Sequence, residues 1–197
     1  MRFILDIKLR GIEDPVIWRK MAVPTVLTFH ELHLMIQAAM GWEHQHLYSF
    51  TEHPESRYFM IVSPYAEEFG ADATKISASN ILWSYLNQYP FDEEAERDKL
   101  YYEYDYGDSW VHEIDVLDLD RSNSKSAELL DGAGACPPEN CGGTPGFQLL
   151  KDHLSGKISP EEYFDNFFAA NPKGYDIHKV DLKRLGNRVK RWRMLDR

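Results

Sequence analysis

The sequence has little cysteine and no long apolar run, and both absences narrow the class of protein. Two cysteines in 197 residues cannot form the disulfide framework of a small secreted domain. No apolar stretch approaches the about 20 residues that cross a membrane, and Asp6 and Lys8 interrupt the N-terminal MRFILDIKLR, so we expect neither a membrane span nor a signal peptide. We therefore expect a cytoplasmic protein with both thiols reduced and no membrane partner.

The short motifs of several enzyme classes are missing as well. The sequence contains no Gly-x-Ser-x-Gly elbow, no phosphate-binding loop and no dinucleotide-binding fingerprint. It also contains no internal repeat and no low-complexity tract. Whether the chain is an enzyme is therefore left open by its motifs.

Positive charge is scarce over most of the chain. The net charge of −10 argues against a protein that coats nucleic acid through bulk charge. Residues 179–197, however, carry eight basic and two acidic side chains, a local charge of +6 that leaves −16 on the other 178 residues. The hydrophobic share of 43% and the charged share of 27% are ordinary for one globular domain, so we expect residues 1–197 to form a single domain.

Apolar periodicity predicts the order of the elements. Alternation with period two predicts strands at 3–10, 16–23, 46–51 and 58–62. A Thr28-x-x-Glu31 capping box opens a helix over 29–40, and helical spacing or capping signals predict further helices at 79–88, 145–154, 160–169 and from 181 onward. The pattern predicts an α+β fold, an antiparallel sheet covered by helices, with a helical C-terminal third. Two segments stand apart: we expect 118–135 to be an exposed excursion and 176–197 to hold a basic amphipathic C-terminal helix.

The most informative stretch is Leu100–Leu117, which reads LYYEYDYGDSWVHEIDVL. Its residues alternate on both sides of a Gly-Asp-Ser turn, so the stretch predicts a β-hairpin. Asp105 and Asp108 lie at or near the bend, although a turn requires neither acid. The pair therefore invites a functional interpretation.

Four motifs in this order resemble the Ri-plasmid ORF-three-like family, over roughly residues 1 to 190. They are Ile17-Trp18-Arg19, Leu32-His33 with Gly41-Trp42 and His46-Leu47-Tyr48-Ser49-Phe50, Tyr104-Asp105-Tyr106-Gly107-Asp108-Ser109-Trp110-Val111-His112, and Pro137-Pro138-Glu139-Asn140-Cys141-Gly142-Gly143. The resemblance implies plasmid- and transposon-associated or chromosomal proteins of unknown role. The family pattern has Glu-Asp where this chain has Glu139-Asn140.

Our leading hypothesis is a binding or interaction module. We expect the hairpin to pack beside the Pro-Pro-Glu-Asn-Cys loop, so that polar side chains from separate motifs line one pocket. The candidates are Arg19, His33, His46, Asp105, Asp108, Trp110, His112 and Glu139.

The runner-up hypothesis is a metal-dependent, hydrolase-like enzyme that uses the same side chains. Histidine, carboxylate and thiolate are the ligands that zinc prefers, and His46, Asp108, His112 and Cys141 are the candidate set. Two other possibilities for catalysis are Cys141 activated by His112 and the two aspartates acting as acid and base.

Two further interpretations remain open. The basic face of the C-terminal helix could neutralise phosphates, as expected for a nucleic-acid-associated protein of a mobile element. Alternatively the motifs are structural: Arg19 would pair with Asp105 or Glu139 in the interior, and Asp105 would accept backbone N–H groups of its own turn.

Overall fold

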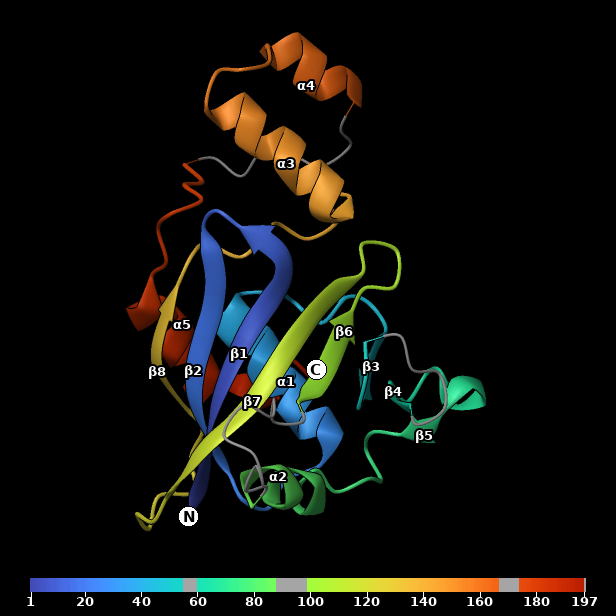
Figure 1. Ribbon diagram of the computed structural model, residues 1–197, viewed down its shortest axis with the longest axis vertical. Helices are drawn as coiled ribbons and strands as arrows, with labels where there is room; N and C mark the ends of the chain where they lie inside the picture. The colour runs from blue at the N-terminus through green and yellow to red at the C-terminus, as the bar shows by residue number, and fades with distance from the viewer. Residues whose placement is uncertain (55–59, 88–98, 167–173, 197) are drawn as a thin grey trace, which may run out of the picture.

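A twisted sheet forms the centre of the computed structural model, which describes residues 1–54, 60–87, 99–166 and 174–196 (Figure 1). Within these residues eight strands lie in the order β5-β4-β3-β6-β7-β1-β2-β8, and every neighbouring pair is antiparallel except β4 and β5. The strands are β1 (Arg2–Glu13), β2 (Val16–Pro24), β3 (Tyr48–Thr51), β4 (Ile61–Val62), β5 (Ala71–Asp72), β6 (Leu100–Tyr104), β7 (Trp110–Asp120) and β8 (Glu128–Ala133).

One face of the sheet is covered by helices. Phe3, Leu5, Ile7 and Leu9 of β1 are fully buried, whereas the alternate positions Lys8 and Arg10 are exposed. The predicted alternation is therefore confirmed. Helix α1 lies behind the middle of the sheet and α5 behind its β8 edge (Figure 1). The helices are α1 (Phe29–Met40), α2 (Ser79–Leu86), α3 (Gly143–Leu154), α4 (Pro160–Asn166) and α5 (Leu182–Lys190), with short 3-10 turns at η1 (Glu67–Phe69) and η2 (Trp192–Met194).

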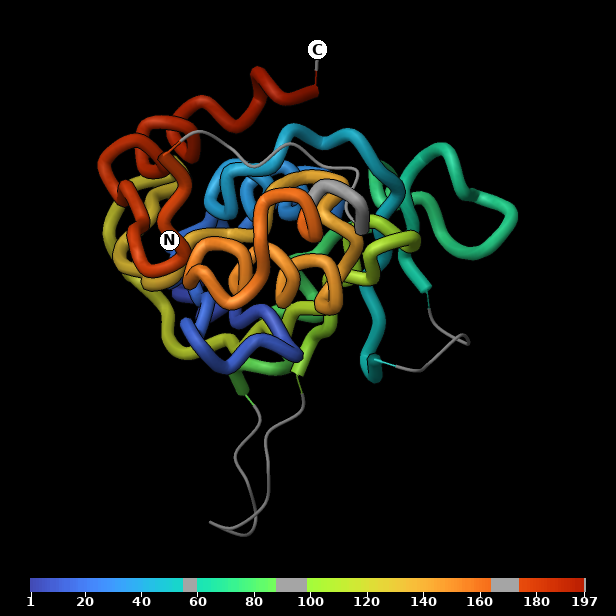
Figure 2. The backbone as a smooth tube through the Cα atoms, turned by 90° about the horizontal axis from the view of Figure 1, so that it is seen from above, coloured from blue at the N-terminus to red at the C-terminus, as the bar shows by residue number. Residues whose placement is uncertain are grey.

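Helix α1 shows how the sequence sets an element's ends. The side chain of Thr28 accepts a hydrogen bond from the Glu31 amide, and the Glu31 side chain returns one to the Thr28 amide, so the predicted capping box is present. Gly41 ends the helix at φ 100, a left-handed conformation that favours glycine. Helices α3 and α4 lie together beyond one end of the sheet, as Figure 2 shows from above.

Two predicted segments differ in the structure. Residues 118–135 are not an excursion: 118–120 complete β7, and β8 pairs with β2 as an edge strand. The Ser, Asp and Gly content predicted a loop wrongly, because an edge strand tolerates polar residues. Gly132 has its own reason, since a Cβ there would lie 2.9 Å from Arg19 Cδ. The C-terminal helix is shorter than 176–197, since α5 begins after its N-cap Asp181.

The remaining boundaries agree with expectation to within a few residues. The apolar stripe of α5 is confirmed, because Leu185, Val189 and Trp192 are buried. The predicted 160–169 helix is described as far as Asn166, and 167–169 lie outside the described residues, as do 58–59 of the predicted fourth strand. The fold is α+β in one domain. None of the described helices has the length and apolar character needed to cross a bilayer.

Candidate functional site

The tyrosine-rich hairpin bends through a strained turn. Asp105 has φ 58 and Ser109 has φ 53, both in the left-handed region that non-glycine residues rarely adopt. The Asp105 carboxylate accepts the Gly107 amide at 3.0 Å, and the Ser109 amide donates to the Asp105 carbonyl at 2.6 Å. Asp105 thus stabilises its own turn, as one of the structural interpretations predicted.

The bend lies against the double-proline loop, residues 136–143. Asp108 Oδ2 accepts the Gly142 amide at 3.1 Å. A Cβ on Gly143 would lie 2.7 Å from the Asp108 carbonyl oxygen, and Gly143 has φ +66, so only glycine allows this approach. The loop is also tied to the end of α1, because Trp42 Nε1 donates to the Pro137 carbonyl at 2.9 Å. The expected juxtaposition of hairpin and loop is therefore present.

Three predicted side chains meet at this junction and form what we call the hairpin site: His46, Asp105 and Glu139. His46 Nε2 lies 3.5 Å from Asp105 Oδ2 and 3.9 Å from Glu139 Oε2. These are ion-pair distances, but neither contact has hydrogen-bond geometry, and Nε2 is buried without a hydrogen-bond partner in the described residues. The three side chains are 27%, 11% and 17% exposed, so the site is accessible at its edge.

Glu139 is the most constrained member of the hairpin site. Its Oε1 accepts the Tyr104 hydroxyl at 3.0 Å and the Glu43 amide at 2.9 Å. Burial raises the pKa of the Glu139 carboxyl, and the hydrogen bonds from Glu43 and Tyr104 oppose that rise. A carboxyl group with an elevated pKa beside an imidazole can exchange protons with it.

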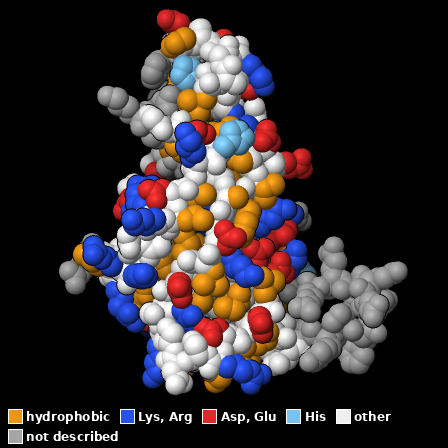
Figure 3. Space-filling model, turned by 90° about the vertical axis from the view of Figure 1, so that its left-hand side faces the viewer, with side chains coloured by type: hydrophobic (Ala, Val, Ile, Leu, Met, Phe, Trp, Pro, Cys, Tyr) orange, Lys and Arg blue, Asp and Glu red, His pale blue; other side chains and the backbone are white. Residues whose placement is uncertain are grey.

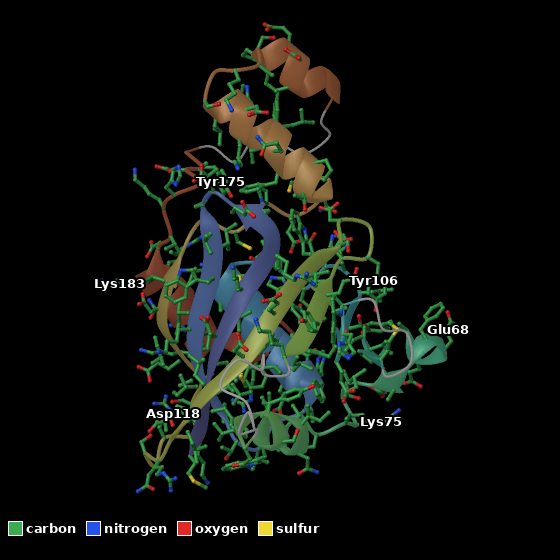
Figure 4. All side chains as sticks on the ribbon, in the orientation of Figure 1. Glu68, Lys75, Tyr106, Asp118, Tyr175 and Lys183 are labelled. Carbon is green, nitrogen blue, oxygen red and sulfur yellow. The ribbon has the colours of Figure 1, made fainter. Side chains whose placement is uncertain are left out.

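Two hollows flank the hairpin site. On one side is a cavity of about 260 Å³ lined by His44, Gln45, His46, Leu47, Ser63 and Tyr65. On the other side of the double-proline loop is a cavity of about 420 Å³, bounded by that loop, Arg19, Trp42 and the start of α5, with Glu139 in its wall. In Figure 4, Tyr106 marks the bend and Tyr175 the end of the sheet near the larger cavity. A ligand could therefore reach the site from either side.

His33 belongs to a different assembly, which we call the histidine–tyrosine cluster: His30, His33, His44, Tyr48 and Tyr102. His33 Nδ1 lies 2.8 Å from the Tyr102 hydroxyl, and its Nε2 lies 2.6 Å from His44 Nδ1. The His33 ring stacks on Tyr48 with centroids 3.6 Å apart. Burial, together with the neighbouring imidazoles, lowers the pKa of both His33 and His44. Both rings are therefore neutral at physiological pH.

The predicted pairing of Arg19 with a carboxylate is wrong. Arg19 pairs with neither Asp105 nor Glu139, although its side chain is fully buried. Instead its guanidinium donates to four backbone carbonyls, those of Trp18, Ala39, Ala133 and Gly134, at 2.7 to 3.0 Å. The carbonyl ends of α1 and β8 lie closer to Arg19 than the hairpin acids do, and they satisfy its donors without a carboxylate.

The other candidates are core residues. Trp110 and His112 are 1% and 0% exposed, and burial lowers the pKa of His112 to about 4. Burial raises the pKa of the Cys141 thiol to about 12, which disfavours Cys141 as a nucleophile at neutral pH. No set of three or more His, Cys, Asp or Glu side chains in the described part of the chain is arranged to hold a metal ion.

The sequence candidates did not include Tyr104, which borders the hairpin site, or four members of the histidine–tyrosine cluster, His30, His44, Tyr48 and Tyr102. The Tyr104 hydroxyl contacts Glu139 and the Gln45 amide. Alternation places Tyr102 and Tyr104 on one face of β6, which was the available signal. His44 gave no such signal, because its φ of 55 turns the chain out of any regular spacing.

The fold and the site define a class of protein: an α+β domain in which a strained hairpin and the double-proline loop place a histidine beside two carboxylates. The model of the family described as plasmid pRiA4b ORF-3-like protein matches residues 2–184, and the chain belongs to that family. The uncharacterized protein y4hQ of Sinorhizobium fredii (strain NBRC 101917 / NGR234) is 30% identical over 180 residues, which cover 89% of this chain and 84% of y4hQ. A crystal structure of a protein of unknown function, MM3350 from Methanosarcina mazei Go1, is similar with a TM-score of 0.69 and 26% identity, covering 92% of this chain and 96% of that one.

Proposed function

We propose that this protein is a binding module whose hairpin site holds a small group rich in hydrogen-bond donors. One observation carries the proposal: the His46 imidazole lies 3.5 and 3.9 Å from two carboxylate oxygens and forms a hydrogen bond with neither. Polar atoms held at such separations are commonly joined by a third group between them. The two flanking cavities support this interpretation by providing room for a ligand.

The chemistry of the site favours a cationic ligand. Asp105 and Glu139 present acceptor oxygens, and a planar guanidinium matches paired acceptors better than a point charge does. The charge of −16 on the residues outside 179–197 attracts cations to the molecule as a whole. The ligand class that fits is a guanidinium or ammonium group, free or on a protein side chain.

A titration with methylguanidine tests the proposal. We expect the ring resonances of His46 to shift in a saturable manner, with a dissociation constant on the order of 1 mM, as suits a ligand of a few heavy atoms. Nuclear magnetic resonance of the isotope-labelled full chain would measure the shift. The absence of a saturable change at His46 would reject the binding site.

Matched variants sharpen the test. Glu139→Gln removes a carboxylate of the hairpin site, whereas Glu103→Gln removes one from the same hairpin that accepts only the Ser109 hydroxyl among its described contacts. We expect the first variant to weaken binding about tenfold and the second to leave it unchanged. Equal weakening would mean that the ligand senses only the net charge of the protein.

A hydrolase-like enzyme is the second candidate, favoured by the elevated pKa of Glu139 beside His46, an arrangement suited to acid–base catalysis. Metal dependence stays a prediction, because catalytic zinc generally needs three protein ligands and the described residues present no such set. Elemental analysis of protein purified without a histidine tag decides the point. Near-stoichiometric zinc, manganese or iron, with a melting temperature that falls on chelation, would favour the enzyme over the binding module.

A further inference from the structure

Two arginines of α5 and the arginine that caps its C-terminus lie in one line along one side of the helix. Arg184, Arg188 and Arg191 are separated by four and three residues, which places them on the same side of a helix. With their neighbours they line a groove of about 320 Å³, which we call the arginine groove: Arg184, Asn187, Arg188, Arg191, Met194 and Leu195. Figure 3 views the side of the molecule that carries α5 and β8 and shows Lys and Arg side chains gathered along one margin.

The helix that carries the groove is firmly anchored. Leu185 and Val189 of the helix, and Trp192 of η2 just beyond it, are buried on the face next to the arginines. Arg188 fixes the inner wall, because its Nη1 contacts Glu43 Oε1 at 2.7 Å and its Nη2 donates to the Trp42 carbonyl at 2.6 Å. The groove is therefore preformed, and a ligand would order little of the chain on binding.

The groove carries positive charge that the described residues do not neutralise. Arg184 and Arg191 are exposed, and neither guanidinium has a hydrogen bond or ion pair within the part of the chain that the structure describes. Arg188 Nε is buried and has no hydrogen-bond partner there either. Because Glu43 pairs with Arg188, two unneutralised cationic groups remain in the groove, Arg184 and Arg191, so the complementary occupant is an anion with more than one charge.

The floor of the groove is apolar. Met194 is 57% exposed and Leu195 lies partly buried beside it. A phosphate backbone would match the arginines but would leave this apolar floor in contact with charged groups. A peptide can supply both carboxylates and an apolar side chain.

We propose that the arginine groove binds an acidic peptide segment of a partner protein. Carboxylates of the segment pair with Arg184 and Arg191, and one apolar side chain of the segment packs against Met194 and Leu195. Fork-shaped guanidinium groups suit this pairing, and a central apolar anchor within a charged rim is the usual anatomy of such interfaces.

A labelled peptide tests the proposal on the full chain. The probe is a fluorescent peptide of glutamates and aspartates around two leucines, compared with the same peptide carrying serines instead and with a single-stranded oligonucleotide of equal charge. Fluorescence anisotropy at about 0.15 M salt measures each affinity. We expect the leucine peptide to bind at least about tenfold more tightly than either competitor.

Two double variants remove the same charge from different faces of α5. Arg184→Gln with Arg191→Gln alters the groove, whereas Lys183→Gln with Lys190→Gln alters the flank, where Figure 4 shows Lys183 pointing outward. All four positions are exposed, so both variants should fold. We expect the arginine pair to weaken peptide binding about tenfold and the lysine pair less than about twofold. Equal weakening, tighter binding of the oligonucleotide, or binding to none of the probes would each overturn the proposal.

Discussion

The hairpin site and the histidine–tyrosine cluster are both built around histidine but differ in how completely their polar atoms are satisfied. In the cluster, His33 has a partner on each ring nitrogen, at 2.8 and 2.6 Å. In the hairpin site, His46 Nε2 has carboxylates nearby and a hydrogen bond to none in the described residues. Saturated buried networks specify a fold, whereas unsatisfied accessible groups are left for a ligand. The presence of a histidine alone therefore does not distinguish a ligand site from a structural cluster.

The largest effect that we expect is a loss of stability at acid pH, caused by the buried imidazoles. The pKa of His112 falls to about 4 in the folded protein against an ordinary value of 6.5, and the pKa of His33 is also lowered. The unfolded chain therefore takes up protons first, so this contribution is complete above pH 6.5 and is lost as the pH falls toward 4. We expect His112 alone to account for about 3 kcal/mol of the loss.

Urea unfolding at pH 7, 5.5 and 4.5 would measure this loss. An unchanged free energy of unfolding between pH 7 and 4.5 would contradict the buried, neutral state of these rings.

Substitution of single histidines should lower the free energy of unfolding more in the histidine–tyrosine cluster than in the hairpin site. His33→Leu leaves a ring nitrogen of His44 without its partner and the Tyr102 hydroxyl with Gln37 alone, and it removes the ring stacked on Tyr48. We expect it to lower the free energy of unfolding by about 3 kcal/mol. His46→Leu removes a group that has no hydrogen bond at Nε2, and the loss should stay below about 1 kcal/mol. Comparable losses would erase the distinction between cluster and site.

At the bend, Asp105 should behave as a turn residue. Asp105→Ala loses the acceptor for the Gly107 amide and places alanine at φ 58, so we expect a loss of about 2 kcal/mol. Asp105→Asn keeps an acceptor and tolerates the left-handed conformation, so it should cost less than about 0.5 kcal/mol. Chemical denaturation of both variants checks the pair, and equal losses would point to the negative charge instead.

Tyr104→Phe should have a smaller effect than His33→Leu or Asp105→Ala. This change removes the hydroxyl that donates to Glu139 at 3.0 Å, at a cost of about 1 kcal/mol. Because that hydrogen bond lowers the pKa of Glu139, the variant should titrate Glu139 at a higher pH than the parent protein. The carboxyl carbon resonance of Glu139 followed through a pH titration reports the change, and a lowered pKa would contradict it.

Much of the fold was predictable because its signals are local. The capping box of Thr28 and Glu31, the alternation in β1 and the apolar stripe of α5 each depend on a few neighbouring residues. We also expected the hairpin to pack beside the double-proline loop, because both carry polar side chains that could line one pocket. Edge strand β8 was missed because its polar composition resembles a loop, and only its pairing with β2 makes it a strand.

The candidate site was predicted only in part, for a physical reason. His46, Asp105 and Glu139 do converge, but His33, Trp110 and His112 lie in the core, and Arg19 donates to carbonyls. Backbone carbonyls are present at every position, so no residue type in the sequence marks them as partners for a guanidinium.

The Arg19 guanidinium connects segments that are far apart along the chain. It binds the carbonyl of Ala39 near the end of α1 and those of Ala133, the last residue of β8, and Gly134. The double-proline loop starts two residues later, at Cys136, so Arg19 fixes the position from which the loop leaves the sheet. Lysine at position 19, with three donors on one tetrahedral nitrogen, cannot bind the same four carbonyls.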